Sequence, residues 1–209
     1  MANDINFSQR TIEKFKNRLS GGGARSNLFE VNFGSDIGGK FTFPWGDEVD
    51  AEDSMLIKTA GLPASSISEI PVPFRGRTLK IAGDRTFDVW TITVINDTNF
   101  KWRNIFERWA NYIVKVSDGS GSIDPNSYQV NAIVSQLSRG QFTGLDQAGR
   151  TGDKSIDVLR YYKIHGLFPT NVSQIDLSYN NENEIEEFTV DLQVQWREAY
   201  DGNGQGQVI

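Results

Sequence analysis

The sequence has no cysteine, a single histidine and no long apolar run. Without cysteine the chain can form neither disulfides nor thiolate metal sites, which suits assembly in a reducing cytoplasm. The lone histidine, His165, excludes a zinc site built from several histidines, and no G-x-S-x-G motif supplies a nucleophile for it. No apolar stretch reaches the length of a membrane span, and the first residues lack the order of a secretory signal. These absences favour a protein that is not an enzyme, needs no cofactor or metal, and does not insert in a membrane.

Composition favours a single acidic domain. The chain has 209 residues, of which 38% are hydrophobic, so it can bury one sizeable core. Its formal net charge of −6 repels nucleic acid, so any relation to DNA should be non-adhesive. We expect an N-terminal helix and Gly-rich linker in residues 1–26, a β domain in residues 27–197 and a flexible polar tail in residues 198–209.

Three segments have only some of the features of a chemical site. The acidic run in residues 47–53 has Glu52 where a calcium loop needs glycine, so a solvated loop is favoured. The Gly-rich segment 144–155 lacks a glycine before its lysine and precedes a strand, unlike a phosphate-binding loop. Glu186 and Glu187 should point to opposite faces of a strand and so cannot share a substrate. A divalent site made only of carboxylates stays open.

Two helices are expected from apolar residues at helical spacing. A short amphipathic helix in residues 8–19 should begin at Ser8 and dock against another surface. The long helix should run from Thr98 to Val116, capped by Asp97 or Thr98. Its tryptophans could stack on nucleic-acid bases, but aromatic residues at this spacing are more often part of a core.

Strands are expected where apolar and polar residues alternate. The predicted strands cover residues 27–33, 54–60, 87–95, 127–137, 154–165 and 187–196. The third of them is apolar on both faces and should lie at the centre of the fold. Large buried aromatic side chains are expected at Trp90, Phe106, Trp109 and Trp196. The patterns predict an antiparallel β-sandwich that closes towards a barrel, with one long flanking helix and a short N-terminal helix.

An extended apolar arm is expected from Gly61 to Phe74. Its three prolines fix φ and remove backbone donors, which excludes a helix or a central strand. The chain should then turn and return as residues 78–82. Because such an arm is too apolar to remain exposed, a neighbouring subunit is expected to cover it. The predicted contact residues are Gly61, Leu62, Pro63, Ile67, Ile70, Pro71, Val72, Pro73, Phe74, Arg75 and Arg77.

Four ordered sequence blocks resemble the tail tube proteins of contractile-tailed bacteriophages. They are NLFEV at Asn27–Val31, the LP…IP arm at Leu62–Pro71, GDRTFDVWTITVIND at Gly83–Asp97, and GLFPTNV at Gly166–Val172 followed by Asn183–Val190. Any one block alone would be a weak match. The four together, in this order, cover most of the chain from Asn27 to Trp196.

The resemblance implies a structural subunit that forms hexameric rings stacked into a hollow tube inside a contractile sheath. Its partners would be copies of itself, the tail sheath, the baseplate and the tail terminator, with DNA crossing the lumen without specific binding. Such a protein is assembled in the host cytoplasm and resides in the virion. Polar strand faces would line the lumen, and the residues expected there are Glu187, Thr189, Asp191, Gln193, Gln195, Gln129, Asn131 and Ser135. The last strand offers no cation to pair with phosphate, so a polyanion could slide past it.

Two alternatives remain at the level of sequence. A baseplate tube initiator, or the inner tube of a phage-derived injection particle, would share the fold. Three segments depart from the plain tube pattern: the longer connections Gly34–Asp53 and Ser138–Asp153, and the polar tail. A β-barrel module that binds small ligands or oligosaccharides would belong to a different class, with Trp45, Trp102 or Tyr179 as stacking surfaces.

Overall fold

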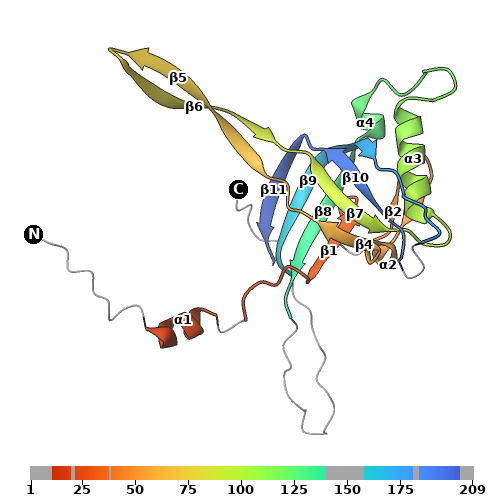
Figure 1. Cartoon of the computed structure of the whole chain (residues 1–209), viewed down its shortest axis with the longest axis horizontal. Helices are drawn as coiled ribbons and strands as arrows, with labels where there is room; N and C mark the ends of the chain where they lie inside the picture. Colours follow the sequence, from red (N-terminus) through yellow and green to blue (C-terminus); the bar gives the residue numbers. More distant parts are fainter. Residues whose placement is uncertain (1–10, 20–21, 38, 140–157, 181–183, 203–209) are drawn as a thin grey trace, which may run out of the picture.

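The computed structural model describes residues 11–19, 22–37, 39–139, 158–180 and 184–202. The predicted N-cap Ser8, most of the predicted connection 138–153 and the end of the polar tail lie outside these residues. Figure 1 shows a sheet-containing body, a long hairpin that projects from it, and a short N-terminal helix set apart from the sheet.

Seven strands form the sheet of the body, and every pairing in it is antiparallel. They are β1 (Phe29–Phe33), β4 (Ile57–Ala60), β7 (Trp90–Ile95), β8 (Val130–Leu137), β9 (Val158–Val172), β10 (Glu187–Gln193) and β11 (Trp196–Asp201). Their order is β1-β8-β9-β10-β7-β4, and β11 also pairs with β9. The long strand β9 therefore has β8 along one side, while β11 and then β10 share its other side.

The predicted architecture of antiparallel strands with few helices is confirmed, but the sheet is open and does not close into a barrel. Its edge strands, β1 and β4, have five and four residues and are not paired with each other. A hollow lined by residues 26, 27 and 29 on one side and 58–61 on the other lies between them. Both edges therefore keep unpaired backbone groups.

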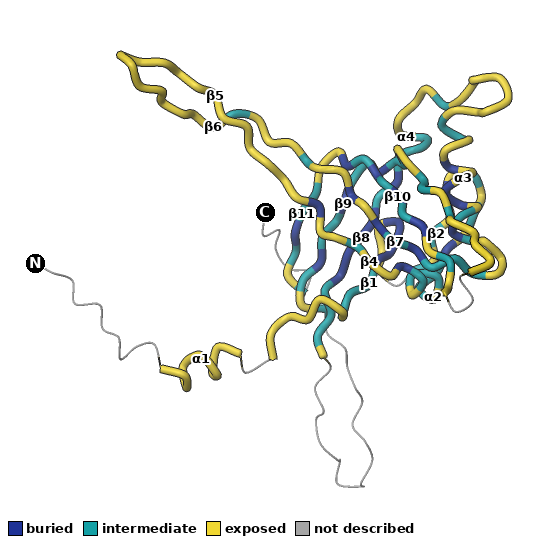
Figure 2. Tube along the Cα trace, viewed as in Figure 1, coloured by how far each residue is buried: buried dark blue, intermediate teal, exposed yellow. Residues whose placement is uncertain are grey.

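The remaining elements are short, apart from the hairpin and one helix. They are α1 (Ile12–Arg18), β2 (Phe41–Thr42), β3 (Glu48–Val49), α2 (Ala51–Ser54), β5 (Ser65–Phe74), β6 (Arg77–Phe87), α3 (Lys101–Ile113) and α4 (Pro125–Tyr128). None of the described helices is long and apolar enough to cross a membrane. Burial is concentrated in the sheet and on one side of α3, whereas the hairpin and α1 are exposed (Figure 2).

The core is an aromatic layer between α3 and the sheet. Trp102, Phe106 and Trp109 are each at most 2% exposed. Their rings contact aromatic residues from β1, from β10 and from the connection between β2 and β3; the pairs are Phe33–Trp102 at 5.4 Å, Phe43–Trp109 at 5.8 Å and Phe106–Phe188 at 6.4 Å between centroids. Burying an indole requires a partner for its N–H group. Trp102 donates to the carbonyl of Asp53 (2.9 Å) and Trp109 to that of Tyr128 (2.7 Å), which ties α3 to α2 and α4.

Helix α3 is shorter than predicted at both ends. Phe100 has a φ of 54°, in the left-handed region, so regular helix begins only at Lys101. The predicted cap Asp97 still acts at this end, because its carboxylate accepts a hydrogen bond from the Lys101 backbone N–H at 2.8 Å. At the other end Val116 is 93% exposed and takes no part in the apolar stripe.

The prediction that Trp196 is a core residue is wrong. Its side chain is 44% exposed, because the chain bends at Gln195 between β10 and β11 and the alternation of faces is reversed beyond the bend. The bend lies against Gly166, whose φ is 66° and whose absent Cβ would lie 2.4 Å from Cγ of Gln195. Only glycine allows this approach. The sheet then continues through β11 to Asp201, so the β domain extends beyond the predicted boundary at residue 197.

Two further predictions need correction. The predicted strand 87–95 is interrupted at Asp88 and Val89, and its second part, β7, is buried only on the face that carries Trp90. It lies next to the edge strand β4 rather than at the centre of the sheet, and its other face carries the polar residues Thr91 and Thr93. Helix α1 begins after Thr11, whose hydroxyl caps it, and none of its described residues is buried.

Replacing Phe106 or Trp109 with alanine should lower the free energy of unfolding by about 3–5 kcal/mol, because each change leaves a large cavity in the aromatic layer. The exposed Val116→Ala change is the matched control and should cost less than about 0.5 kcal/mol. Urea unfolding of the unassembled chain measures both. Equal midpoints for the core and control variants would contradict the packing described here.

Candidate functional site: a hairpin and a polar sheet face

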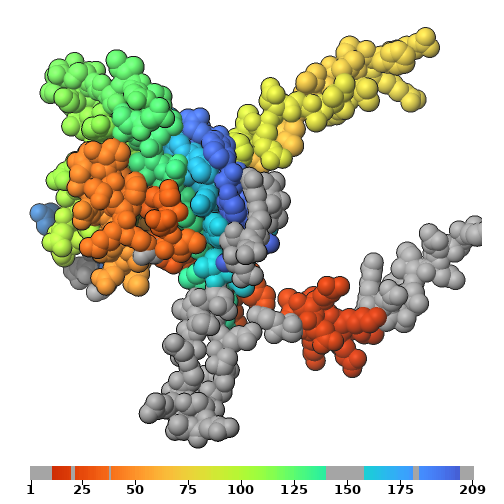
Figure 3. Space-filling view, turned by 180° about the vertical axis from the view of Figure 1, so that it is seen from behind, coloured from red at the N-terminus to blue at the C-terminus, as the bar shows by residue number. Residues whose placement is uncertain are grey.

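Strands β5 and β6 form a two-stranded hairpin that extends far from the sheet (Figures 1 and 3). Its turn is Arg75-Gly76, with φ values of 46° and 80°, and positive φ at both central residues suits the tight turns that match strand twist. Pro71 and Pro73 fit β5 because a two-stranded ribbon has a free edge on each side. The predicted excursion is therefore a hairpin, and it continues to Phe87 rather than ending near Gly83.

The hairpin has one apolar and one polar face. Cross-strand pairing puts Val72 opposite Leu79 and Ile70 opposite Ile81. We call these four residues, with Phe74 beyond them, the apolar face of the hairpin; their exposed fractions range from 38% to 66%. The other face carries prolines and an ion pair between Glu69 and Lys80 at 2.7 Å. A monomer therefore leaves a continuous apolar surface in water.

The hairpin is anchored to the core at its base. Gly61, Leu62 and Pro63 lead into it from β4, and the carbonyl of Gly61 accepts a 2.5 Å hydrogen bond from the indole of buried Trp90. The backbone N–H of Asp88 donates to the carbonyl of Ala64 at 3.2 Å, which closes the base. Among the predicted arm residues, Pro63 is buried here while those further out are exposed.

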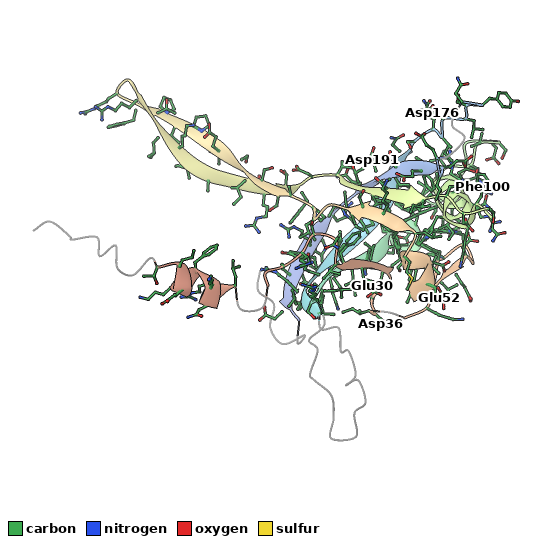
Figure 4. All side chains as sticks on the ribbon, turned by 60° about the horizontal axis from the view of Figure 1, so that its bottom comes forward. Glu30, Asp36, Glu52, Phe100, Asp176 and Asp191 are labelled. Carbon is green, nitrogen blue, oxygen red and sulfur yellow. The ribbon has the colours of Figure 1, made fainter. Side chains whose placement is uncertain are left out.

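The polar face of β10 carries the first four predicted lumen residues in alternation: Glu187, Thr189, Asp191 and Gln193. Glu187 is paired with Lys58 of β4 at 2.6 Å, a cation that the pattern of the last strand did not predict. Asp191 accepts hydrogen bonds from Thr91 (2.6 Å) and Asn171 (3.1 Å) on the two neighbouring strands. Figure 4 labels Asp191 on this part of the sheet.

The hydrogen bonds to Asp191 stabilise its ionised form. The bond from the Thr91 hydroxyl, followed by that from the Asn171 amide, lowers the pKa of the Asp191 carboxyl below its ordinary value, and partial burial opposes this only weakly. The carboxylate is therefore charged at neutral pH and oriented by its neighbours.

The other predicted lumen residues lie outside β10, and three of them, Gln129, Asn131 and Gln195, gather at Gly166 of β9. Ser135 is fully buried, so the prediction that it lines a lumen is wrong. Asn131 accepts a hydrogen bond from the Gly166 backbone at 3.2 Å, and Gln129 ends α4. Gln195 lies in the bend between β10 and β11.

A set of stacked side chains on β9 and β11 was not predicted. The His165 and Trp196 rings stack at 3.9 Å, and Tyr161 stacks on Tyr200 at 5.0 Å. Nε2 of His165 lies 3.4 Å from the Glu198 carboxylate. The bend at Gln195 reverses the faces of the strand and brings these side chains together. The apolar–polar alternation of the sequence does not indicate the bend, so it could not predict the stacking.

Carboxylates of the acidic run stabilise the fold instead of forming a solvated loop. Asp50 caps α2 and Asp53 completes the capping box. Asp53 also pairs with Lys101 at 2.5 Å, and Asp47 pairs with Arg108. Within the part of the chain that the structure describes, no group of three metal-ligating side chains is gathered.

Two of the three proposed stacking surfaces are occupied. Trp102 is 2% exposed, and Trp45 stacks on Phe43 and Trp109 at 4.7 and 5.2 Å. Tyr179 is fully exposed. These positions do not form the concave aromatic site that a sugar-binding module needs.

Comparisons with known proteins agree on one family. The family model described as phage tail tube protein matches residues 24–197. The chain is 35% identical over 179 residues to tail tube protein gp19 of Enterobacteria phage T4, covering 86% of this chain and 93% of the relative. It is 26% identical over 184 residues to the tail tube protein of Serratia phage KSP90, covering 87% and 93%.

Two solved structures share the fold. A chain of the anti-feeding prophage tube-terminating cap has a TM-score of 0.54 at 14% identity, covering 86% of this chain and 91% of its own. A chain of the extended sheath/tube terminator of an extracellular contractile injection system has a TM-score of 0.54 at 12% identity, covering 85% and 96%.

Replacing Asp191 with asparagine should change how stability depends on pH. Because the folded-state pKa is lowered, the charged carboxylate contributes stability above the unfolded pKa of about 3.9, and this contribution is lost as pH falls through the folded pKa. The wild-type chain should therefore unfold at a higher temperature than Asp191→Asn at pH 6, and the difference should shrink below about pH 4. Asp88→Asn, at an exposed site outside this network, is the control. If the difference in unfolding temperature stayed constant down to pH 2, the ionised Asp191 carboxylate would not be the source of the stability.

Proposed function

Because the chain belongs to the phage tail tube protein family, we propose that it is the subunit of a contractile phage tail tube, built from stacked hexameric rings around a lumen that conducts DNA. The observation that carries this proposal is the 35% identity to a tail tube protein across 93% of that protein's length. As a tail tube family member it is a structural component of the virion. We infer no catalytic role.

The open sheet fits a subunit that is completed by its neighbours. Edge strands β1 and β4 keep free backbone donors and acceptors, which an isolated protein normally covers or blocks. In a closed ring β1 and β4 would each meet a neighbouring subunit, so these two edges would no longer be free to misassemble. The tail sheath, the baseplate and the tail terminator would be the further partners.

The hairpin is the proposed arm between subunits. Its apolar face would stay in water in a single chain, and burying apolar surface yields roughly 25 cal/mol per Å². The anchor at Gly61 fixes where the arm leaves the body, so it can present this face in one direction. Pro63 belongs to the anchor and not to the contact surface.

The polar face of β10 is the proposed lumen wall. It presents Glu187, Thr189, Asp191 and Gln193, and Lys58 neutralises only Glu187. Asp191 keeps its charge and repels phosphate. Lys58 is paired with Glu187 and is therefore less available to bind phosphate. A wall of this kind would let DNA pass without adhering.

A tube initiator in a baseplate, or the inner tube of an injection particle, would use the same fold and remains the alternative within this class. Negative-stain microscopy of the purified protein tests the proposal. Long tubes support a tube subunit, isolated single rings support an initiator, and compact monomers at high concentration would contradict both.

Removing the hairpin should abolish tubes but not folding. Because Asp88 and Ala64 are hydrogen-bonded at the base, a Gly-Gly link can replace residues 65–87 without disturbing the sheet. The variant should unfold cooperatively, yet it should form no tubes because the apolar contact is missing. Thr78→Ser, on the polar face, is the control and should assemble normally. Normal tubes from the deletion variant would disprove the role of the arm.

Adding cations to the wall should slow DNA passage without preventing assembly. Thr189→Lys with Gln193→Lys avoids the bonded side chains of Glu187 and Asp191. Repeated around a ring, these lysines would form a belt of phosphate partners. Phage carrying them should build tails of normal length but release DNA more slowly, while Thr189→Ser with Gln193→Asn should behave as wild type. Normal release from the lysine variant would show that this face does not line the lumen.

A further inference from the structure

The tip of the hairpin combines apolar and cationic groups. The Arg75 guanidinium lies over the Phe74 ring at 5.3 Å, and Arg77 is directly opposite Phe74 on β6. All three residues are exposed, and neither arginine has a carboxylate partner among the described ion pairs. A surface that would cover this tip must therefore offer both apolar contact and negative charge.

Such a surface exists on the same chain, in the connection between β9 and β10. Residues 174–178 and 184–187 line a groove of about 580 Å³. Leu177 and Ile185, with exposed fractions of 78% and 71%, give it apolar walls. Asp176 and Glu184 add two carboxylates that no cation pairs within the described part of the chain. We call this feature the acidic groove.

The tip and the acidic groove lie at opposite ends of the sheet. The hairpin leaves the sheet where β4 ends at Ala60 and β7 begins at Trp90, whereas the groove adjoins the other end of β7, where Ile95 pairs with Glu187. Figure 4 shows Asp176 on the far side of the body from the hairpin. The hairpin points away from the body, so it cannot reach the groove of its own chain (Figure 1).

We propose that the hairpin tip of one copy docks in the acidic groove of a second copy in the adjacent ring. This inference rests on the proposed function, since it names the two surfaces that join one ring to the next. Phe74 contacts the apolar walls formed by Leu177 and Ile185, and the two arginines pair with Asp176 and Glu184. The contact joins different surfaces at opposite ends of the subunit, so it repeats without closing, as a tube of stacked rings requires.

Charge reversal tests the docking. Arg75→Glu with Arg77→Glu, or Asp176→Lys with Glu184→Lys, should each raise the protein concentration at which tubes appear by about tenfold or more, equivalent to 1.4 kcal/mol per tenfold. Combining all four changes restores opposite charges and should recover most of the loss. Arg85→Glu, at the base of the hairpin, is the matched control and should have little effect.

The outcomes separate this inference from the proposed function. If wild-type protein and every charge variant form tubes at the same concentration, or if the combined variant assembles no better than the single-surface variants, the docking is wrong while the tube subunit stands. If the wild-type chain forms neither rings nor tubes, the proposed function fails, and the inference fails with it. Far-UV circular dichroism identifies variants that do not fold.

Thiol cross-linking provides an independent test, because the natural chain has no cysteine. Val72→Cys on the apolar face is combined with Leu177→Cys in the groove, and assembled tubes are treated with a short bis-thiol cross-linker. A ladder of linked chains on a denaturing gel is expected. Thr78→Cys with Leu177→Cys places the first thiol on the opposite face of the hairpin and should give little ladder. Tubes that form from the first variant without any ladder would overturn the docking.

Discussion

The aromatic layer between α3 and the sheet is the packing interaction on which the body of the subunit depends. Trp102, Phe106 and Trp109 are buried on one side of the helix, and their rings meet aromatic residues of β1, β10 and the segment before β3. The buried indoles of Trp90, Trp102 and Trp109 each donate their N–H group to a backbone carbonyl. Since those carbonyls belong to α2, to α4 and to the base of the hairpin, three connections that could have been mobile are tied to the core.

The parts of the fold that follow from local pattern could be predicted, and those that depend on contacts between distant residues could not. The alternation along β10 and the apolar stripe of α3 are local, so the residues alone indicate both elements. The bend at Gln195 depends on a neighbouring strand, because it lies against Gly166 of β9. The sequence around Trp196 contains no sign of it, and the alternation was therefore extended too far.

The candidate surfaces show the same division. Prolines and apolar residues outside any regular strand pattern indicate an arm, and the arginine-glycine turn agrees with a hairpin. The acidic groove, however, is built from two short segments with no pattern of their own, and only the pairing of β9 with β10 brings them together. Similarly, Lys58 is far from Glu187 in sequence, and the antiparallel pairing around β7 places them side by side.

The anchoring of the hairpin has a mechanical consequence. Its two strands continue into β4 and β7, which are adjacent in the sheet, and the Trp90 indole holds the point of departure. A pull along the hairpin therefore acts parallel to β4 and β7. A force in this direction loads all the hydrogen bonds between the strands at once, instead of opening them one after another. Strength under such a load is set by the rate of unfolding rather than by equilibrium stability. A subunit built in this way can carry tension along the direction in which its arm extends.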